Sequence, residues 1–310
     1  MFKKLPAFAA VLCLLLTGCL EFERQTLTYQ YDAKTDTLRI FQNYQGIFGV
    51  DKKDELSAQE LEQLQSVLNT QRTFFFANWI AEFSRDSISE ELAKSKTPEA
   101  DETPAGTAAR GRLGTLLQLL LDNVRVENGG LYLDDKGKLC GVQRVTFTHF
   151  SNLLVAGNEV IRDALKAESK KDSSDASLTA EERALYAKSA AGPAHYIQIE
   201  GNQIRFRFPT TRAKFEENFG STAGVNKLLE EFRPFGGTLA FAENEMKWSI
   251  GKPAAKTTRV TLSVSDKPYV PNLLTAVKKQ SIAVREKFDP EAAAKDFLGP
   301  ASNKAEKQPK

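Results

Sequence analysis

Histidine and cysteine, the residues that most often carry metal and nucleophilic chemistry, are scarce in this chain. Its 310 residues include two histidines and three cysteines. The sequence has no H-E-x-x-H motif, no paired C-x-x-C and no acidic calcium loop. It also lacks a G-x-S-x-G elbow, a phosphate-binding loop and a dinucleotide-binding glycine pattern. These absences exclude the enzyme classes whose signature is local in sequence, and we predict neither a metal ion nor a cofactor.

The remaining polar candidates have structural explanations. His149 lies at the end of a predicted strand and His195 on the apolar face of a predicted hairpin, so either would serve as a general base only beside a serine. The adjacent carboxylates Asp134 and Asp135 precede Gly137 and are typical of a solvated turn. Arg205 and Arg207 on one polar strand face could bind an anion. Glu200 is a near neighbour on the opposite strand, so surface ion pairing is the favoured alternative.

Long hydrophobic runs are missing beyond the N-terminus. After Lys3 and Lys4, the segment 5–18 is uncharged and mostly apolar, and it contains 14 residues. A membrane-spanning helix needs about 20 apolar residues, whereas a secretory signal has a shorter core behind a positive start. Residues 1–18 are therefore predicted to be a signal peptide that is removed.

The end of this segment, Leu16-Thr17-Gly18-Cys19, resembles the lipobox of bacterial lipoproteins. The alternative is an ordinary signal peptide with a chance cysteine. The resemblance implies that the Cys19 thiol receives a diacylglyceryl group and becomes the first residue of the mature protein. Acyl chains on Cys19 would then hold the protein at a membrane. Because Leu20, not Asp, follows, the resemblance also implies the outer membrane, facing the periplasm, if the source has two membranes.

Removing residues 1–18 leaves a chain of 292 residues with neither excess charge nor a disulfide. The signal contains Lys3 and Lys4 and no acid, so 40 basic and 40 acidic residues remain. This balance argues against nucleic acid as a partner. Cys13 is discarded and Cys19 is acylated, which leaves Cys140 as a lone thiol in a strand-like run, where we expect it to be buried and inert.

The periodicity predicts an α+β fold, an antiparallel sheet built from hairpins with helices packed mainly on one face. A two-residue turn at Gly201-Asn202 pairs Ile199 with Ile204, and a second hairpin pairs Leu239 with Trp248. A hairpin followed by a helix recurs near residues 26, 131, 195 and 238, without residue identity between the copies, so an internal repeat stays open.

Composition changes divide the predicted mature chain into segments. We expect a lipid-anchored tether at 19–25, a ββα part at 26–93, a flexible linker at 94–110, a main α+β part at 111–288 and a C-terminal tail at 289–310 that is mobile beyond a short helical start at Asp289-Pro290.

Three functions remain open for the mature chain. The first is a lipid-anchored protein of the bacterial cell envelope, acting as a non-catalytic binding or assembly module for an unknown envelope protein or glycan. The alternative is an envelope hydrolase that cleaves glycan or peptide through a carboxylate pair, which the 40 acidic residues do not allow us to locate. A partner-blocking lipoprotein with the 94–110 loop as its contact is the third.

Overall fold

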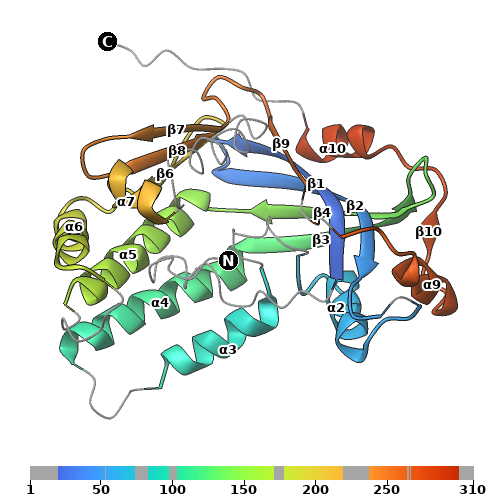
Figure 1. Ribbon diagram of the computed structural model, residues 1–310, viewed down its shortest axis with the longest axis horizontal. Coiled ribbons are helices and arrows are strands. Elements are labelled where there is room, and N and C mark those ends of the chain that lie inside the picture. The colour runs from blue at the N-terminus through green and yellow to red at the C-terminus, as the bar shows by residue number, and fades with distance from the viewer. Residues whose placement is uncertain are drawn as a thin grey trace.

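A six-stranded sheet forms the centre of the molecule in the computed structural model (Figure 1). The structure describes residues 20–52, 54–73, 83–97, 103–170, 178–218, 237–263, 265 and 267–299. Strand order is β10-β3-β4-β2-β1-β9, with only β10 parallel to its neighbour. The strands are β1 (Leu20–Asp32), β2 (Thr37–Gly49), β3 (Val124–Leu133), β4 (Leu139–Phe147), β9 (Thr258–Ser263) and β10 (Val284–Arg285).

A second, four-stranded antiparallel sheet has the order β5-β6-β8-β7. Its strands are β5 (Ile197–Glu200), β6 (Gln203–Phe208), β7 (Gly237–Phe241) and β8 (Met246–Ile250). Ile199 is opposite Ile204 and Leu239 is opposite Trp248, so both predicted hairpin registers are confirmed. The apolar face of this sheet packs onto one end of the large sheet, where Trp248 and Ile250 join Leu27 and Tyr29 in a shared cluster.

Helices cover the large sheet mainly on one face, as predicted. In Figure 1, α3, α4 and α5 lie side by side under one half of the sheet, and α2 and α9 under the other. On the opposite face, α10 packs against Phe41 and Tyr132. The helices are α2 (Ala58–Leu68), α3 (Arg85–Ser95), α4 (Pro104–Asn123), α5 (Phe150–Ser169), α6 (Ala180–Ala191), α7 (Arg212–Asn218), α9 (Asn272–Lys279) and α10 (Pro290–Leu298).

Buried glutamines separate the two apolar clusters beneath the sheet. Gln25, Gln42 and Gln143 are each at most 2% exposed. The Gln25 amide donates to Gln42 Oε1 at 3.2 Å, and the Gln143 amide donates to the Arg72 carbonyl at 3.0 Å. Hydrogen bonding of this kind offsets the cost of removing polar groups from water, which explains how polar residues occupy the middle of the sheet.

Three of the predicted segment boundaries differ from the structure. Residues 20–25, expected in the tether, form the first half of β1. The expected linker 94–110 overlaps the end of α3 and the first turns of α4, because Thr103 and Pro104 begin a helix. Since β2 pairs with β4 across that segment, the parts at 26–93 and 111–288 share one sheet.

The helical start expected at Asp289-Pro290 is present, with Asp289 as the N-cap, but the helix is longer than expected. Residues 290–298 form α10, whose Ala294 and Leu298 are 7% and 3% exposed. The predicted signal at 1–18, Cys19 and residues 300–310 lie outside the described residues.

Candidate functional site

The first described residue, Leu20, is fully buried at the start of β1. Leu20 and Phe22 are both 0% exposed, and they pack with residues of α2 and α9. The Leu20 backbone N–H donates to Gln63 Oε1 at 3.0 Å. The residue that follows Cys19 in the sequence is therefore part of the core, with its backbone fixed by a side chain of α2.

Two further buried polar side chains close this end of the β1–β2 pair. Asn272 accepts the Gly49 N–H at 3.0 Å, and its amide donates to the carbonyls of Gly49 at 2.9 Å and Lys52 at 2.6 Å. Glu60 is 0% exposed and accepts the Val50 N–H at 2.6 Å. We call this region the Leu20 end; it comprises Leu20, 49–52, Glu60, Gln63 and Asn272.

Glycine is required at position 49 of the Leu20 end. A Cβ on Gly49 would lie 2.6 Å from Glu60 Oε1 and 2.6 Å from the Leu56 side chain. Both are far closer than van der Waals contact, so the strand backbone can approach α2 only without a side chain here.

Three lysine–glutamate pairs lie around the Leu20 end. Lys267 lies 2.7 Å from Glu21, Lys138 lies 2.6 Å from Glu23, and Lys52 lies 2.8 Å from Glu55. Each lysine therefore has a carboxylate partner, and these three pairs add no net charge to this end of the molecule.

The opposite end of β1 is held by Asn202, the second residue of the β5–β6 turn. Asn202 is 6% exposed, and its amide donates to the carbonyls of Ala255 at 2.7 Å and Lys256 at 2.8 Å. Its Oδ1 accepts the Tyr31 N–H at 2.6 Å, and its backbone carbonyl accepts the Tyr29 hydroxyl at 3.1 Å. We call this region the Asn202 end; it comprises Tyr29, Tyr31, 33–36, Asn202 and Thr258.

The structure places Ser151 near His149, but the serine hydroxyl is bound elsewhere. His149 is exposed, with φ 49°, at the N-cap of α5. Ser151 Oγ donates to Asp36 Oδ2 at 2.6 Å, and Tyr31 Oη donates to Asp36 Oδ1 at 2.9 Å. Among the described residues, no hydrogen bond joins the His149 ring to Ser151, so they do not form a nucleophile–base pair.

The same hydrogen bonds determine the protonation of Asp36. Partial burial acts to raise the pKa of this carboxyl, but the hydrogen bonds from Ser151 and Tyr31 and the nearby His149 outweigh it and lower the pKa. Burial and the acceptor Asp36 together raise the pKa of Tyr31 to about 12. Asp36 is therefore an ionised cap for the N-terminus of α5.

His195 is not on the apolar hairpin face that we expected. It is exposed and precedes β5, which begins at Ile197, and its backbone N–H donates to the Pro193 carbonyl at 2.9 Å. The local turn removes it from the strand alternation on which the prediction rested.

The Asp134-Asp135 pair occupies a turn, as predicted. Asp134 Oδ1 accepts the N–H groups of Lys136 at 2.9 Å and Lys138 at 2.8 Å, while Asp135 is exposed. A carboxylate that binds its own turn in this way has a structural role.

The arginines on β6 belong to a surface with both charge signs. Arg205 donates to Glu200 at 3.1 Å and to Gln203 at 2.8 Å, which agrees with the surface-pairing alternative. Arg207 is directly opposite Lys247 on β8, and Lys247 pairs with Glu245 at 2.6 Å. Carboxylates therefore balance two of these three cations, and the face lacks the charge excess of a strong anion site.

Cys140 is buried, as predicted. It is 0% exposed among residues that include Phe41, Tyr132, Val142 and Ala294. Burial raises the pKa of its thiol to about 11, so the reactive thiolate is rare at neutral pH.

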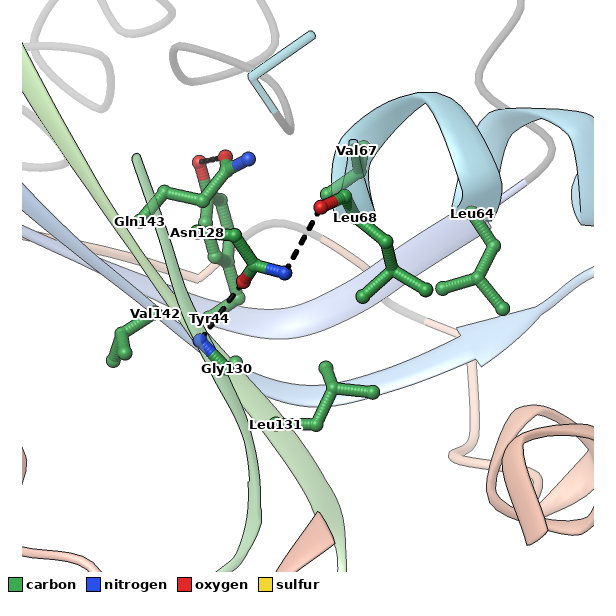
Figure 2. A pocket seen from close by; sticks show the side chains of 10 residues that line it. Tyr44, Leu64, Val67, Leu68, Asn128, Gly130, Leu131, Val142 and Gln143 are labelled. Carbon is green, nitrogen blue, oxygen red and sulfur yellow. Dashed lines mark hydrogen bonds between the residues drawn. The ribbon is translucent and has the colours of Figure 1, made fainter. Parts of the chain in front are cut away.

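One small pocket lies between α2 and the β3–β4 pair (Figure 2). Its volume of about 10 Å³ is near the lower limit for one water molecule. Asn128, which donates to the Leu68 carbonyl at 3.3 Å and accepts the Gly130 N–H at 2.8 Å, closes one side of it. The lining residues include neither a carboxylate nor a histidine. Ligand pockets of about 300 Å³ or more are much larger.

Two searches were confined to the residues with described positions. No group of three or more His, Cys, Asp or Glu that could hold a metal ion occurs within 20–299, gaps excepted. Within the same ranges, no helix has the length and apolar character needed to cross a membrane.

Comparisons of the chain with family models, with curated proteins and with solved structures find no match.

Proposed function

We propose that this chain is a bacterial envelope lipoprotein whose Cys19 carries the acyl chains and whose folded body is a non-catalytic binding or assembly module. The observation that carries the proposal is the sequence Leu16-Thr17-Gly18-Cys19 behind a short apolar segment, which resembles a lipobox and would put cleavage just before Cys19. Leu20, the next residue, belongs to β1 of the folded body.

The character of the polar residues supports the non-catalytic part of the proposal. Ser151 is bound to Asp36, the burial of Cys140 disfavours its thiolate, and the pocket in Figure 2 has no carboxylate. None of these three features provides the carboxylate pair that the hydrolase alternative needs. The 94–110 segment is largely helical where it is described, which weakens its use as a flexible blocking loop.

Acylation is tested by expressing three full-length variants in a bacterial host. Wild type and Cys13→Ser should yield an N-terminal peptide that starts at residue 19 and carries a diacylglyceryl mass increment. Cys19→Ser should lose that increment and stay uncleaved. Retention of acyl label and membrane fractionation by Cys19→Ser would contradict the proposal. Cys13→Ser is the matched control because it changes a cysteine six residues earlier, inside the predicted signal.

The outer-membrane assignment is part of the same proposal and needs a different measurement. Substituting Asp for Leu20 would place a carboxylate at a fully buried position and would disrupt the fold. Density separation of inner and outer membranes from a two-membrane host, followed by immunodetection of the wild-type protein, is therefore the suitable test. Recovery with the inner membrane would contradict the assignment.

A further inference from the structure

We propose that the Leu20 end rests directly on the bilayer and that the four-stranded sheet is the part of the body farthest from the membrane. This inference depends on acylation at Cys19. Cys19 is joined to Leu20 by one peptide bond, so their Cα atoms lie about 3.8 Å apart. Because Leu20 is fully buried, the acyl chains leave the body at a fixed point on its surface.

The Leu20 end is too well fixed to serve as a flexible spacer. Its backbone N–H is bound to Gln63, and Leu20 pairs with Gly49, which is itself held by Asn272. Detaching the first residues of β1 would expose Leu20 and Phe22, two fully buried apolar side chains. Acyl chains on Cys19 would therefore be attached one residue away from the sheet, with no flexible peptide segment inside the described part of β1.

The course of β1 determines which parts of the body are near the membrane and which are far from it. The strand has 13 residues, and at roughly 3.3 Å per residue it extends for about 40 Å. Figure 1 shows β1 beginning beside α2 and running toward β6 and β8. Asn202 binds Tyr29 and Tyr31 at the far end of the strand. The anchor point is thus next to α2 and α9, and the small sheet lies at the opposite end.

Charge around the Leu20 end does not form a clear basic patch. Lys52, Lys138 and Lys267 are each paired with a glutamate, and the exposed residues 278–279 in the last turn of α9 are lysines, while the Leu20 end itself contains the exposed Asp51. Binding of a basic patch to anionic lipid would need unmatched lysines or arginines. We therefore expect the same orientation on zwitterionic and on anionic bilayers, because the covalent attachment sets it.

The test compares two labelled sites on the processed, acylated protein. Asp54→Cys puts an exposed thiol near the Leu20 end, and the matched variant Lys34→Cys puts one on the β1–β2 turn at the Asn202 end. Acylation occupies the Cys19 thiol, and burial protects Cys140, so a maleimide dye should react only at the introduced site. Each protein is bound to phosphatidylcholine vesicles whose headgroups carry a nitroxide quencher.

We expect about threefold stronger quenching at residue 54 than at residue 34, since about 40 Å of strand separates the two ends. Replacing a third of the lipid with phosphatidylglycerol should leave that ratio unchanged. Equal quenching at the two sites, stronger quenching at residue 34, or a ratio that depends on anionic lipid would overturn the proposed orientation.

A linker variant tests the direct attachment separately. A Gly/Ser insertion of about 12 residues between Cys19 and Leu20 spans roughly 20 Å on average and should lower the quenching at residue 54 toward that at residue 34. No change on insertion would overturn the claim of direct attachment. The mass of the N-terminal peptide is measured on every sample. An unacylated wild type would contradict the proposed function itself, whereas an acylated protein with the wrong quenching pattern contradicts only the orientation.

Discussion

The two ends of β1 are closed in different ways, although both use buried polar side chains on strand backbone. At the Leu20 end, Gln63, Glu60 and Asn272 come from two helices and divide the backbone groups among them. At the Asn202 end, one residue binds Tyr29, Tyr31, 255–256 and Thr258. The contacts at the Leu20 end are shared among three side chains, whereas those at the Asn202 end depend on one. A single substitution should therefore reduce stability more at the Asn202 end.

The largest effect is expected from Asn202→Ala. The change removes the hydrogen bonds from the Tyr31 N–H and to the carbonyls of Ala255 and Lys256, three groups of which Tyr31 and Ala255 are partly buried and Lys256 is exposed. An unsatisfied buried polar group costs about 1–3 kcal/mol, and water can replace part of these bonds, so we expect a loss of about 3 kcal/mol in the free energy of unfolding. Urea unfolding of the processed protein, followed by far-UV circular dichroism, measures it.

The control for this variant is Asn244→Ala. Asn244 also belongs to a hairpin turn, between β7 and β8, and it is only partly buried. We expect a change within about 0.5 kcal/mol. Similar losses for the two variants would mean that the Asn202 contacts do not concentrate stability at that end.

A smaller loss is expected from Asn272→Ala at the Leu20 end. Asn272 is 2% exposed and holds Gly49 and Lys52, but Glu60 and Gln63 continue to bind neighbouring backbone groups. We expect the free energy of unfolding to fall by about 2 kcal/mol. Asn152→Ala, at an exposed position of α5, is the control and should change it by less than about 0.5 kcal/mol. A loss as large as that of Asn202→Ala would contradict the distributed arrangement.

Sequence periodicity was enough to predict the hairpins, because the residues that set their register are close together in the sequence. The alternation on both strands allows one register around Gly201-Asn202, and the structure has that register. The clamp made by Asn202 was not predictable in the same way. Its partners lie about 170 residues earlier and about 50 residues later, and asparagine beside glycine is already explained as a turn residue.

Errors at the segment boundaries have a related cause. Buried Gln25 interrupts the apolar alternation of β1, so residues 20–25 resemble a polar tether in sequence. The start of α10 at Asp289-Pro290 has a local signal, but its apolar residues, Ala293, Ala294, Phe297 and Leu298, stand in a segment that is otherwise polar and charged, so its full length was not predicted. The beginning of α4 did carry a local signal, the N-cap Thr103 and Pro104, but its first turns contribute little to the apolar core.

A pH-dependent difference between the ends is expected from Asp36. Its lowered pKa means that the folded state binds the proton less tightly than the unfolded chain does. The stabilisation is therefore complete above the unfolded value of about 3.9 and is lost as pH falls through the lower folded value. Asp36→Asn should reduce stability by about 0.5–1 kcal/mol at pH 7, and the difference from wild type should shrink toward pH 3.

The control for Asp36→Asn is Asp135→Asn, on an exposed turn outside the Asn202 end. It should change stability little and should not alter the pH profile. If the difference in stability between Asp36→Asn and wild type stayed constant from pH 7 to pH 3, the ionised carboxylate of Asp36 at the N-terminus of α5 would not contribute to stability.

The smallest expected quantity is the coupling between the two ends. Residues 20 and 30 of β1 are separated by up to about 33 Å at the usual rise per residue, and Asn202 and Asn272 share no hydrogen-bond partner. Sites so far apart without shared partners are usually additive within about 0.5 kcal/mol. The double variant Asn202→Ala/Asn272→Ala should thus lose the sum of the two single losses. A coupling of 1 kcal/mol or more, as an order of magnitude, would mean that β1 transmits strain between its ends. A change in the contacts that hold the Leu20 end would then alter the stability of the contacts at the Asn202 end.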